Sequence, residues 1–361
     1  MKQVTIQTPS KTYPVKIGEE MTNEIVMFIK KRFPKVSNVW IIADEEVFTL
    51  HGTSLAVTLK DFFKLTIYKA PKGEYAKSFR VYEEAITHGL EHKVDRHSLV
   101  LAFGGGAIGD LAGFVASTYM RGIPFIGVPT TILAHDSAVG GKVAINHPLG
   151  KNMVGQFYQP EGVFFDLNYF KTLPEKEVLS GFAEVIKHAF LSSSSFLEEI
   201  MSSFHSVNNL DKKFLIDCLV KGIEVKGDIV SKDERESNIR AFLNFGHTYG
   251  HAVESSSGYG NRTHGESVMI GMIYALYLSK IYYNLSFNLS TFITWIKSIG
   301  YDLKVPDSIS FEVLYQGMQH DKKSQDGVPV FVLLRSIGEP EMVKVSKEDL
   351  IKADGFIRQI T

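Results

Sequence analysis

The sequence predicts an α/β fold for its first half and a mainly α-helical fold for its second half. Up to residue 172, short runs rich in β-branched and aromatic residues alternate with segments of helical periodicity, a pattern typical of a parallel sheet covered by helices on both faces. After Thr172-Leu-Pro174, long segments of helical periodicity dominate. Because a chain of 361 residues exceeds the roughly 250–300 residues that one core usually holds, we expect two domains, 1–172 and 173–361.

The strands of the first half are short and apolar. Alternating residues at 4–6 and 13–17 predict a hairpin, and a helix is expected at 25–33. Buried strands, with helices between them, are predicted at 39–43, 65–68, 99–103, 125–128 and 162–166.

The second half begins its helical pattern shortly after Pro174. A single short strand is indicated at 328–334, near the end of the chain. Helices are predicted at 177–191, 196–204, 211–230, 245–255, 267–283 and 292–299.

Composition narrows the class of protein. The hydrophobic fraction is 44% and the charged fraction 22%, as in ordinary globular proteins. With 39 basic and 40 acidic side chains, there is no general basic field for nucleic acid or an anionic membrane. The apolar stretch at 268–278 is too short to span a bilayer, and the single cysteine, Cys218, lies among apolar residues, as expected for a packing residue in a reducing compartment. We therefore expect a soluble, cytoplasmic protein.

A glycine-rich turn follows the strand at 99–103. It reads Gly104-Gly-Gly-Ala-Ile-Gly109-Asp110 and leads into an apolar helical pattern. Glycines between a strand and a helix let backbone N–H groups approach a pyrophosphate, so the turn predicts a dinucleotide site. The usual dinucleotide fold has this turn after its first strand. Here it follows a later strand, and Asp44, at the end of an earlier one, is the better candidate for the ribose hydroxyls.

Three cationic residues downstream of this turn have few acidic neighbours in the sequence. Arg121, Lys142 and Lys151 occur among glycines and apolar residues rather than among acids. Because an unpaired buried charge is costly, we interpret them as partners of an anion, against the alternative of lysines on surface loops.

The second half carries a histidine cluster. His247, His251 and Glu254 are spaced i, i+4 and i+7, so they project from one helix face, and His264 follows shortly after. Three protein ligands plus an open position form the catalytic zinc pattern. The candidate ligands are the three histidines with Glu184, Glu254 and Glu266; Glu184 shares a helix face with Lys187. Spacing leaves His251 and His264 open as the second imidazole. The histidines interpreted as surface or packing residues are His51, His88, His92, His97, His147, His205 and His320.

These motifs occur together in one order. They are Gly-Gly-Gly-x-x-Gly-Asp, Tyr-Met-Arg-Gly, Pro-Thr-Thr, Asp-Ser-x-Val-Gly-Gly-Lys, Gly-Lys-Asn, Ala-Glu-Val-Ile-Lys, Leu-Asn-Phe-Gly-His-Thr-x-Gly-His-Ala-x-Glu, His-Gly-Glu and Asp-Lys-Lys. With these motifs in this order, the sequence resembles the 3-dehydroquinate synthase family from about residue 44 to residue 338. The departures from the family's pattern are small, and Ala138, in place of a frequent serine, touches no proposed catalytic group.

The resemblance implies a Rossmann-like NAD-binding domain and a helical metal-binding domain, with the active site in the cleft between them. It implies Zn²⁺ or Co²⁺ held by Glu184, His247 and His264, and so moves His251 to the substrate side. The NAD contacts that it implies are Asp44, Gly73, Glu74, Lys77, Gly104, Gly105, Gly106, Gly109, Asp110, Thr130, Thr131, Asp136, Lys142, Lys151, Phe170 and Thr172.

The substrate groups are implied in the same way. Lys142, Asn152, Lys187 and His251 are expected to serve catalysis. Further substrate contacts are expected from Arg121, Lys226, Arg240, Asn244 and either Lys322 or Lys323. In the family the arginine at the Arg121 position reaches the neighbouring subunit's site, which implies a homodimer.

The family's reaction converts 3-deoxy-D-arabino-heptulosonate 7-phosphate to 3-dehydroquinate and phosphate, by oxidation, phosphate elimination, re-reduction and aldol closure. A sugar phosphate with a carboxylate accounts for the many Arg and Lys candidates. The alternatives are another sugar phosphate cyclase, a metal-dependent polyol dehydrogenase of related fold that releases NADH, and a non-catalytic sensor of NAD or metal.

Overall fold

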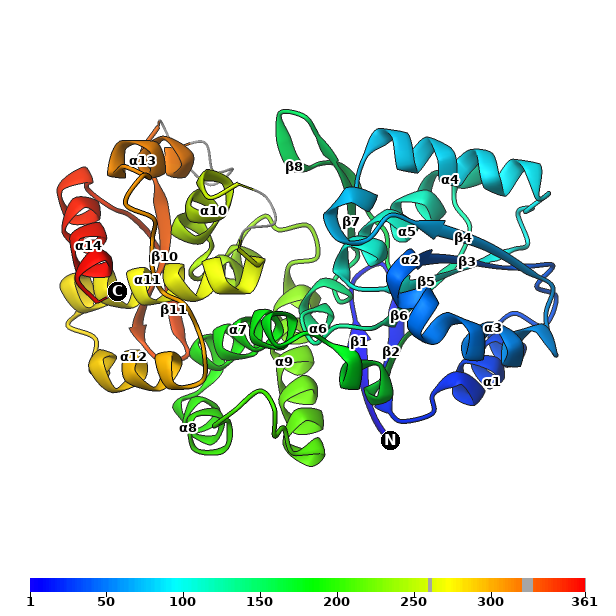
Figure 1. Ribbon diagram of the computed structural model, residues 1–361, viewed down its shortest axis with the longest axis horizontal. Coiled ribbons are helices and arrows are strands. Elements are labelled where there is room, and N and C mark those ends of the chain that lie inside the picture. The colour runs from blue at the N-terminus through cyan, green and yellow to red at the C-terminus, as the bar shows by residue number, and fades with distance from the viewer. Residues whose placement is uncertain (259–261, 320–326, 361) are drawn as a thin grey trace. The chain divides into compact units, whose positions relative to one another are not determined.

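The computed structural model describes residues 1–258, 262–319 and 327–360 (Figure 1). The chain divides into two compact units. The first unit contains Met1–Leu173 together with Lys226–Arg235, and the second contains Pro174–Val225 and Glu236–Thr361.

The first unit is built on a seven-stranded sheet. Its order is β1 (Lys2–Gln7), β2 (Thr12–Gly18), β9 (Val163–Asp166), β6 (Phe125–Pro129), β5 (Leu99–Gly104), β3 (Val39–Asp44) and β4 (Leu65–Ala70). All neighbours pair in parallel except the hairpin β1–β2. The predicted hairpin, strands and fold class are confirmed.

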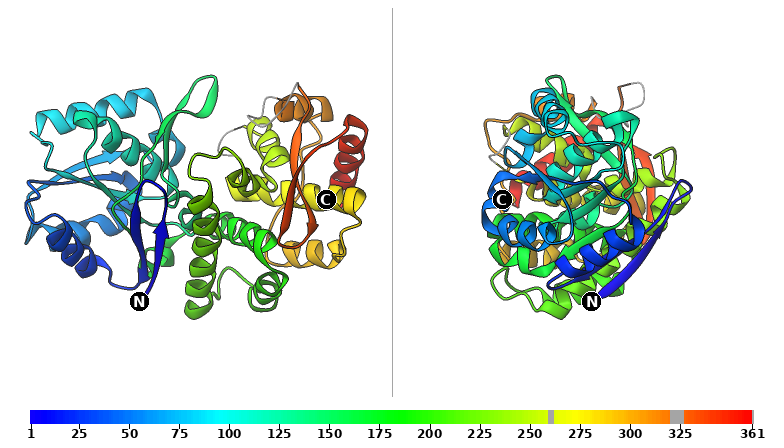
Figure 2. Two further views of the ribbon diagram at one scale, coloured as in Figure 1. Left: turned by 180° about the vertical axis from the view of Figure 1, so that it is seen from behind. Right: turned by 90° about the vertical axis from the view of Figure 1, so that its right-hand side faces the viewer.

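Helices cover both faces of this sheet, as the views in Figure 2 let the reader follow. Side chains alternate between two cores along each strand: Ile41 and Leu101 pack with residues of α1 (Thr22–Arg32) and α3 (Thr53–Lys60). Trp40 and Val100 face the other side. There they pack with α4 (Phe79–Glu91) and α5 (Gly106–Thr118).

The parallel strands bring several candidate site residues to one edge. β3 ends at Asp44, β5 at Gly104 and β6 at Pro129, and the carboxyl ends of parallel strands meet at the same edge of a sheet. A separate hairpin follows, β7 (Lys142–His147) with β8 (Gly150–Phe157). The sequence did not predict it, because it is rich in polar residues and glycine. Short elements between these are α2 (Glu45–Val47), η1 (Phe48–Gly52), η2 (Gly73–Ala76), η3 (Tyr119–Arg121), α6 (Ala134–Ser137) and η4 (Leu167–Thr172).

The second unit is mainly helical, as predicted. Its elements are α7 (Glu175–Ser192), α8 (Ser194–Ser203), most of α9 (Lys212–Lys232), η5 (Ile239–Asn244), α10 (His247–Ser256), α11 (His264–Tyr283), α12 (Leu289–Ser298), α13 (Phe311–Gln319) and α14 (Lys347–Gln359), with a hairpin of β10 (Val330–Ser336) and β11 (Glu339–Lys344). The six predicted helices are confirmed, and the indicated strand is β10. α13, α14 and β11 were not predicted. Cys218 is buried, as expected. No helix among the described residues is long and apolar enough to cross a membrane.

The helices α10 and α11 approach each other backbone to backbone. A Cβ atom on Gly271 of α11 would overlap the carbonyl oxygen of Gly246 and lie 2.8 Å from the backbone nitrogen of Gly250. Only hydrogen fits at this position, so the closeness of the two helices depends on it.

We predict that Gly271→Ala lowers the free energy of unfolding by about 2–3 kcal/mol, because overpacking forces two backbones apart. Gly355→Ala is the matched control, since its Cβ would meet no atom within 4 Å in α14. That substitution should be neutral or stabilising by about 0.5–1 kcal/mol. Urea denaturation of both variants measures the difference, and equal stability would contradict the prediction.

Candidate active site

Three helices of the second unit bring a carboxylate and two imidazoles together. Glu184 lies on α7, while His247 and His264 are the first residues of α10 and α11. Glu184 Oε1 is 3.7 Å from His247 Nε2 and 3.6 Å from His264 Nε2. Two imidazole nitrogens and one carboxylate oxygen converging on one point form a donor set that suits Zn²⁺ or Co²⁺.

His251 belongs to the same cluster. Ligand nitrogens of His247, His251 and His264 lie within 4.8 Å of one another. His251 is the most exposed of the three and its ring is 5.1 Å from that of His247. The structure therefore brings all the candidate imidazoles together, and the choice of His264 over His251 as the second imidazole stays a prediction.

Glu184 is buried, with 1% of its surface exposed. Its Oε2 is in direct contact with the ammonium group of Lys187, one turn along α7 and equally buried. Lys187 thus supplies the positive partner that a buried carboxylate needs.

The two ligand candidates titrate differently. Burial lowers the pKa of His247 well below its usual value, so this imidazole is neutral near pH 7 and able to bind a metal. Its Nδ1 lies 3.2 Å from the Phe245 carbonyl oxygen; as donor to this carbonyl, it leaves Nε2 available. Burial would also lower the pKa of His264, but hydrogen bonds to Glu184 and Glu254 raise it to about 9.

Glu254 orients His264. Its Oε2 is 3.1 Å from His264 Nδ1, which directs the opposite ring nitrogen toward Glu184. Glu254 was a candidate ligand in the sequence, but its contact is with the outer nitrogen of the imidazole. A carboxylate in that position fixes the ring and increases the basicity of the ligating nitrogen.

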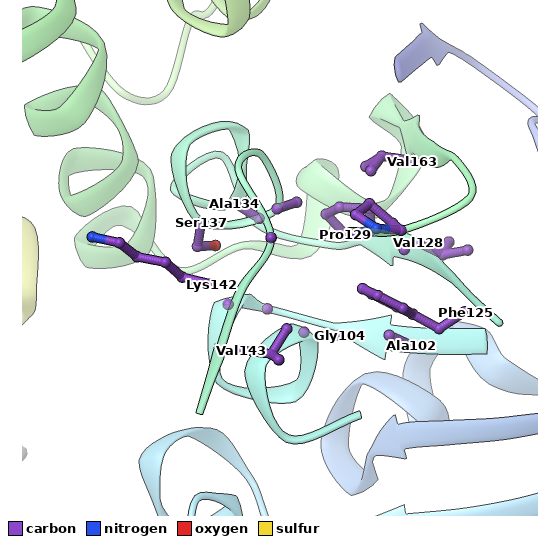
Figure 3. Close-up of a pocket in the computed structure, with 17 residues that line it drawn as sticks. Ala102, Gly104, Phe125, Val128, Pro129, Ala134, Ser137, Lys142, Val143 and Val163 are labelled. Carbon is purple, nitrogen blue, oxygen red and sulfur yellow. The ribbon is translucent and has the colours of Figure 1, made fainter. Parts of the chain in front are cut away.

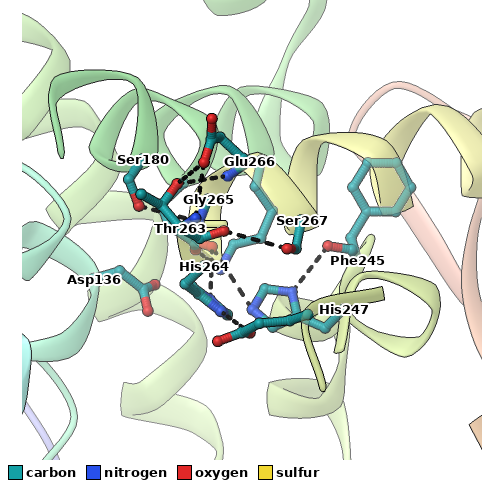
Figure 4. Close-up of polar contacts among 12 residues, drawn as sticks. Asp136, Ser180, Phe245, His247, Thr263, His264, Gly265, Glu266 and Ser267 are labelled. Carbon is teal, nitrogen blue, oxygen red and sulfur yellow. Dashed lines mark hydrogen bonds and ion pairs between the residues drawn. The ribbon is translucent and has the colours of Figure 1, made fainter. Parts of the chain in front are cut away.

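A capping box fixes the backbone of His264 (Figure 4). The Thr263 hydroxyl accepts a hydrogen bond from Glu266 N, and Glu266 Oε2 accepts one from Thr263 N at 2.8 Å. Glu266, another candidate ligand, thus serves the helix terminus. The box also starts α11 at His264, three residues before the predicted start, because the predicted start relied on apolar periodicity alone.

Gly265 lets α11 approach α7. Its N–H donates to Ser180 Oγ at 3.1 Å, and a Cβ atom here would overlap the Ser180 backbone. Since Ser180 lies one turn before Glu184, this contact brings His264 to the carboxylate.

Further predicted substrate groups lie on and beside η5. Arg240 is buried with 1% of its surface exposed. Asn244 Nδ2 donates to Glu236 Oε1 at 3.2 Å. Glu236 adopts a positive φ of 59°, which costs energy for a residue with a Cβ, and it was not among the predicted site residues. Lys322 and Lys323 lie outside the described residues.

The glycine turn of the first unit lines a pocket (Figure 3). Gly104, Gly105, Gly106 and Gly109 contribute to it, as does Lys142, whose side chain extends away from Phe125 and Val163. A Cβ atom on Gly106 would lie 2.8 Å from Ser137 Oγ, so the serine hydroxyl lies directly against the glycine turn.

Hydroxyl groups around this turn are available to a ligand. Among the described residues, the buried hydroxyls of Thr130, Thr131 and Ser137 have no protein hydrogen-bond partner. Such groups are costly to bury unless a ligand or water satisfies them. Thr130 and Thr131 were predicted as cofactor contacts, whereas Ser137 was not, although it stands beside Asp136 in the quoted motif. The cradle and these hydroxyls fit the pyrophosphate of a dinucleotide.

Asp44 and its neighbours form the next part of the predicted cofactor site. Asp44 Oδ1 accepts from Glu46 N at 2.9 Å, and Oδ2 accepts from Gly73 N at 3.0 Å. Asn146 donates to Glu74 Oε2 at 2.8 Å. The structure thus joins Asp44 to the Gly73-Glu74 turn, and a contact of Asp44 with a ribose stays a prediction.

Lys77 is buried and contacts two other predicted residues. Its Nζ is 2.6 Å from Asp110 Oδ2 and also donates to Asn152 Oδ1. Burial raises the pKa of the Asp110 carboxyl, although the Lys77 ammonium lowers it in part. Asn152 has a positive φ of 56°, a left-handed conformation that asparagine tolerates better than most residues.

The remaining predicted residues of the first unit are distributed around it. Lys226 Nζ is 3.0 Å from Asp136 Oδ2. Phe170 is buried in η4, where the Thr172 hydroxyl bonds His51 Nε2 at 2.7 Å. Lys151 lies on β8.

Arg121 is exposed at the end of η3. Met120, Arg121 and Gly122 have φ values of 49°, 70° and 116°. Two residues with a Cβ in this region mark stored strain, which clusters at functional positions.

Fold and site together define a class. A parallel sheet with a glycine cradle and a helical unit with a His/Glu cluster are the parts of a dinucleotide- and metal-dependent enzyme. Comparison with known proteins identifies the family of enzymes.

Residues 67–180 match the family described as 3-dehydroquinate synthase N-terminal, and residues 181–324 match 3-dehydroquinate synthase C-terminal. A 3-dehydroquinate synthase of Listeria monocytogenes serotype 4b (strain F2365) is 50% identical over 351 residues, which cover 97% of this chain and 96% of the relative. The chain belongs to the 3-dehydroquinate synthase family.

Two solved structures widen the comparison. A 2-deoxy-scyllo-inosose synthase complexed with carbaglucose-6-phosphate, NAD⁺ and Co²⁺ is 25% identical, with a TM-score of 0.89 and 99% of both chains covered. A glycerol dehydrogenase from Schizosaccharomyces pombe is 14% identical, with a TM-score of 0.68, covering 99% of this chain and 90% of that one. The second likeness is one of fold alone.

We predict that Glu254→Gln weakens Zn²⁺ binding about 10- to 100-fold, because the His264 ring loses its orienting carboxylate. Competition with a chromophoric chelator measures the affinity. Glu348→Gln, which removes an exposed carboxylate paired with Lys352 in the same unit, should leave it unchanged. Equal affinities of the two variants would contradict the orienting role.

We also predict that Ser137→Ala weakens NAD⁺ binding about 3- to 10-fold, the effect of one hydrogen bond of about 1 kcal/mol. The control is Ser117→Ala, whose hydroxyl already donates to Phe114 O. Calorimetric titration with NAD⁺ distinguishes the two, and an unchanged affinity of the Ser137 variant would exclude a contact with the cofactor.

Proposed function

We propose that the chain converts 3-deoxy-D-arabino-heptulosonate 7-phosphate to 3-dehydroquinate and phosphate, with catalytic NAD and a divalent metal. The observation that carries the proposal is the 50% identity over 97% of the chain to a 3-dehydroquinate synthase. The pathway is then aromatic biosynthesis through shikimate.

Glu184, His247 and His264 would hold Zn²⁺ or Co²⁺. The residues of the cradle, with Asp44, would hold NAD. When bound, NAD⁺ accepts and returns a hydride, and the metal polarises substrate hydroxyls. Glu254 keeps His264 in its ligating orientation, and Lys187 balances the charge of Glu184 when the metal is absent.

Lys142, Asn152 and His251 would hold and polarise the leaving phosphate. Cationic and neutral donors near a dianion stabilise it through charge-assisted hydrogen bonds. We assign no separate base, because the phosphate is itself able to take the proton from the neighbouring C–H as it leaves.

Lys226, Arg240 and Asn244 would bind the substrate carboxylate. Arg240 is almost fully buried, and a buried guanidinium suits a planar, bidentate partner. Arg240→Ala should therefore raise KM more than it lowers kcat.

This carboxylate site distinguishes the proposal from its rivals. Cyclases that make an inosose or a valiolone act on sugar phosphates without a carboxylate, so they need no such cationic group. A polyol dehydrogenase would release NADH in each turnover, and a sensor protein would need none of these catalytic residues.

The test is phosphate release from the sugar phosphate with catalytic NAD⁺ and Zn²⁺, with and without a chelator. We expect chelator-sensitive release without net NADH, and loss of turnover by at least about 10³-fold in His264→Ala through loss of metal. NADH accumulation from simple polyols would instead identify a dehydrogenase, and release from a sugar phosphate lacking the carboxylate would identify another cyclase.

We also propose a homodimer in the cytoplasm, with Arg121 serving the partner's site. The exposure and strained backbone of Arg121 support this role. Light scattering should give twice the chain mass. Mixing inactive Arg121→Ala with inactive His264→Ala should restore activity through hybrid dimers, and no recovery after subunit exchange would contradict the shared site. Cell fractionation tests the location.

A further inference from the structure

The end of α9 belongs to the first unit, although the helix begins in the second. Gly227 packs closely on β1, where an added Cβ would lie 2.8 Å from Ile6 Cδ1. Lys226 is paired with Asp136 at one end of this segment. At the other end is Glu234, which none of the roles described so far involves.

Glu234 gathers donors from two distant stretches of the chain. Its Oε2 accepts from Ser10 N at 3.1 Å, and its Oε1 accepts from the Ser10 hydroxyl and from Gln159 Nε2, the latter at 2.7 Å. Burial alone would raise the pKa of Glu234, but hydrogen bonds from Ser10, Gln159 and Thr8 lower it. The carboxylate is therefore ionised at neutral pH and makes charge-assisted hydrogen bonds, which are the stronger kind.

Gln159, which donates to Glu234, also packs against the loop before Lys142. It is 4% exposed, and a Cβ atom on Gly141 would lie 2.6 Å from its Cδ. The neighbouring Tyr158 N–H donates to Gly141 O at 2.7 Å. Gly141 has a φ of 67°. Both this φ and the close approach of the Gln159 side chain favour glycine immediately before Lys142.

We propose that Glu234 is a positioning residue that locks the segment Lys226–Arg235 onto the first unit and so fixes the ammonium group of Lys226. The role of Lys226 toward an anionic substrate rests on the proposed function. The partners described for Glu234 are Thr8, Ser10 and Gln159, and Glu234 acts through the backbone that it holds. Lys226 is thereby carried by the cofactor-binding unit and not by the metal-binding unit.

Hydrogen exchange tests the lock without reference to activity. Glu234→Ala removes the carboxylate and should accelerate exchange in 226–235 about 10-fold or more. Ser10→Ala removes the hydroxyl donor but keeps the Ser10 N–H bond to Oε2, and should accelerate exchange to a smaller extent. Glu24→Gln removes a carboxylate that pairs with Lys16 in the same unit and should not. Unchanged protection of 226–235 in both test variants would overturn the proposal.

Steady-state kinetics tests the consequence for Lys226. Glu234→Ala should raise KM for the sugar phosphate about 5- to 10-fold, with kcat within about two-fold and the Kd of NAD⁺ unchanged, the pattern of lost ground-state binding. In a Lys226→Ala background the same substitution should add little, since coupled residues are non-additive. Full additivity, or an unchanged KM with loosened exchange, would overturn the positioning role. An inactive wild-type protein would count against the proposed function alone, because the exchange experiment does not depend on turnover.

Discussion

The buried carboxylate of Glu184 is the constraint around which the second unit is organised. An ionised group removed from water must be compensated, and here Lys187 contacts one oxygen while His247 and His264 face the other. These groups come from three helices, so the helices must converge within a few ångströms. Gly265 and Gly271 make that possible, because side chains at either position would overlap a neighbouring backbone.

The first unit differs, because its candidate site for a large anionic ligand offers mainly neutral donors and few charges. Backbone N–H groups at the start of α5 and the hydroxyls of Thr130, Thr131 and Ser137 are neutral donors, and a helix N-terminus adds a favourable dipole. The charged residues nearby are already matched, as with Lys77 and Asp110. Neutral donors provide directional hydrogen bonds without the desolvation cost of ionised groups.

Local patterns predicted much of this arrangement. Apolar runs located the strands, the glycine turn was recognisable between strand and helix, and the i, i+4 spacing predicted that His247 and His251 share a helix face. The functions of Glu254 and Glu266 were not accessible in this way. Whether a carboxylate faces the inner or the outer nitrogen of His264 depends on how α10 meets α11, and the start of α11 depends on a capping box that apolar periodicity ignores. α14 escaped notice because its sequence is polar and contains Gly355.

The assignment of Lys226–Arg235 to the first unit affects how the protein can be dissected. A fragment ending at residue 173 would contain the whole seven-stranded sheet, yet it would leave Ser10 and Gln159 without the carboxylate that joins them. An independent cofactor-binding fragment therefore needs 226–235 supplied as a second piece or spliced onto its end. The first unit is discontinuous in the sense used for inserted domains, so a single crossover point near residue 173 would separate 1–173 from the segment 226–235 that packs with it.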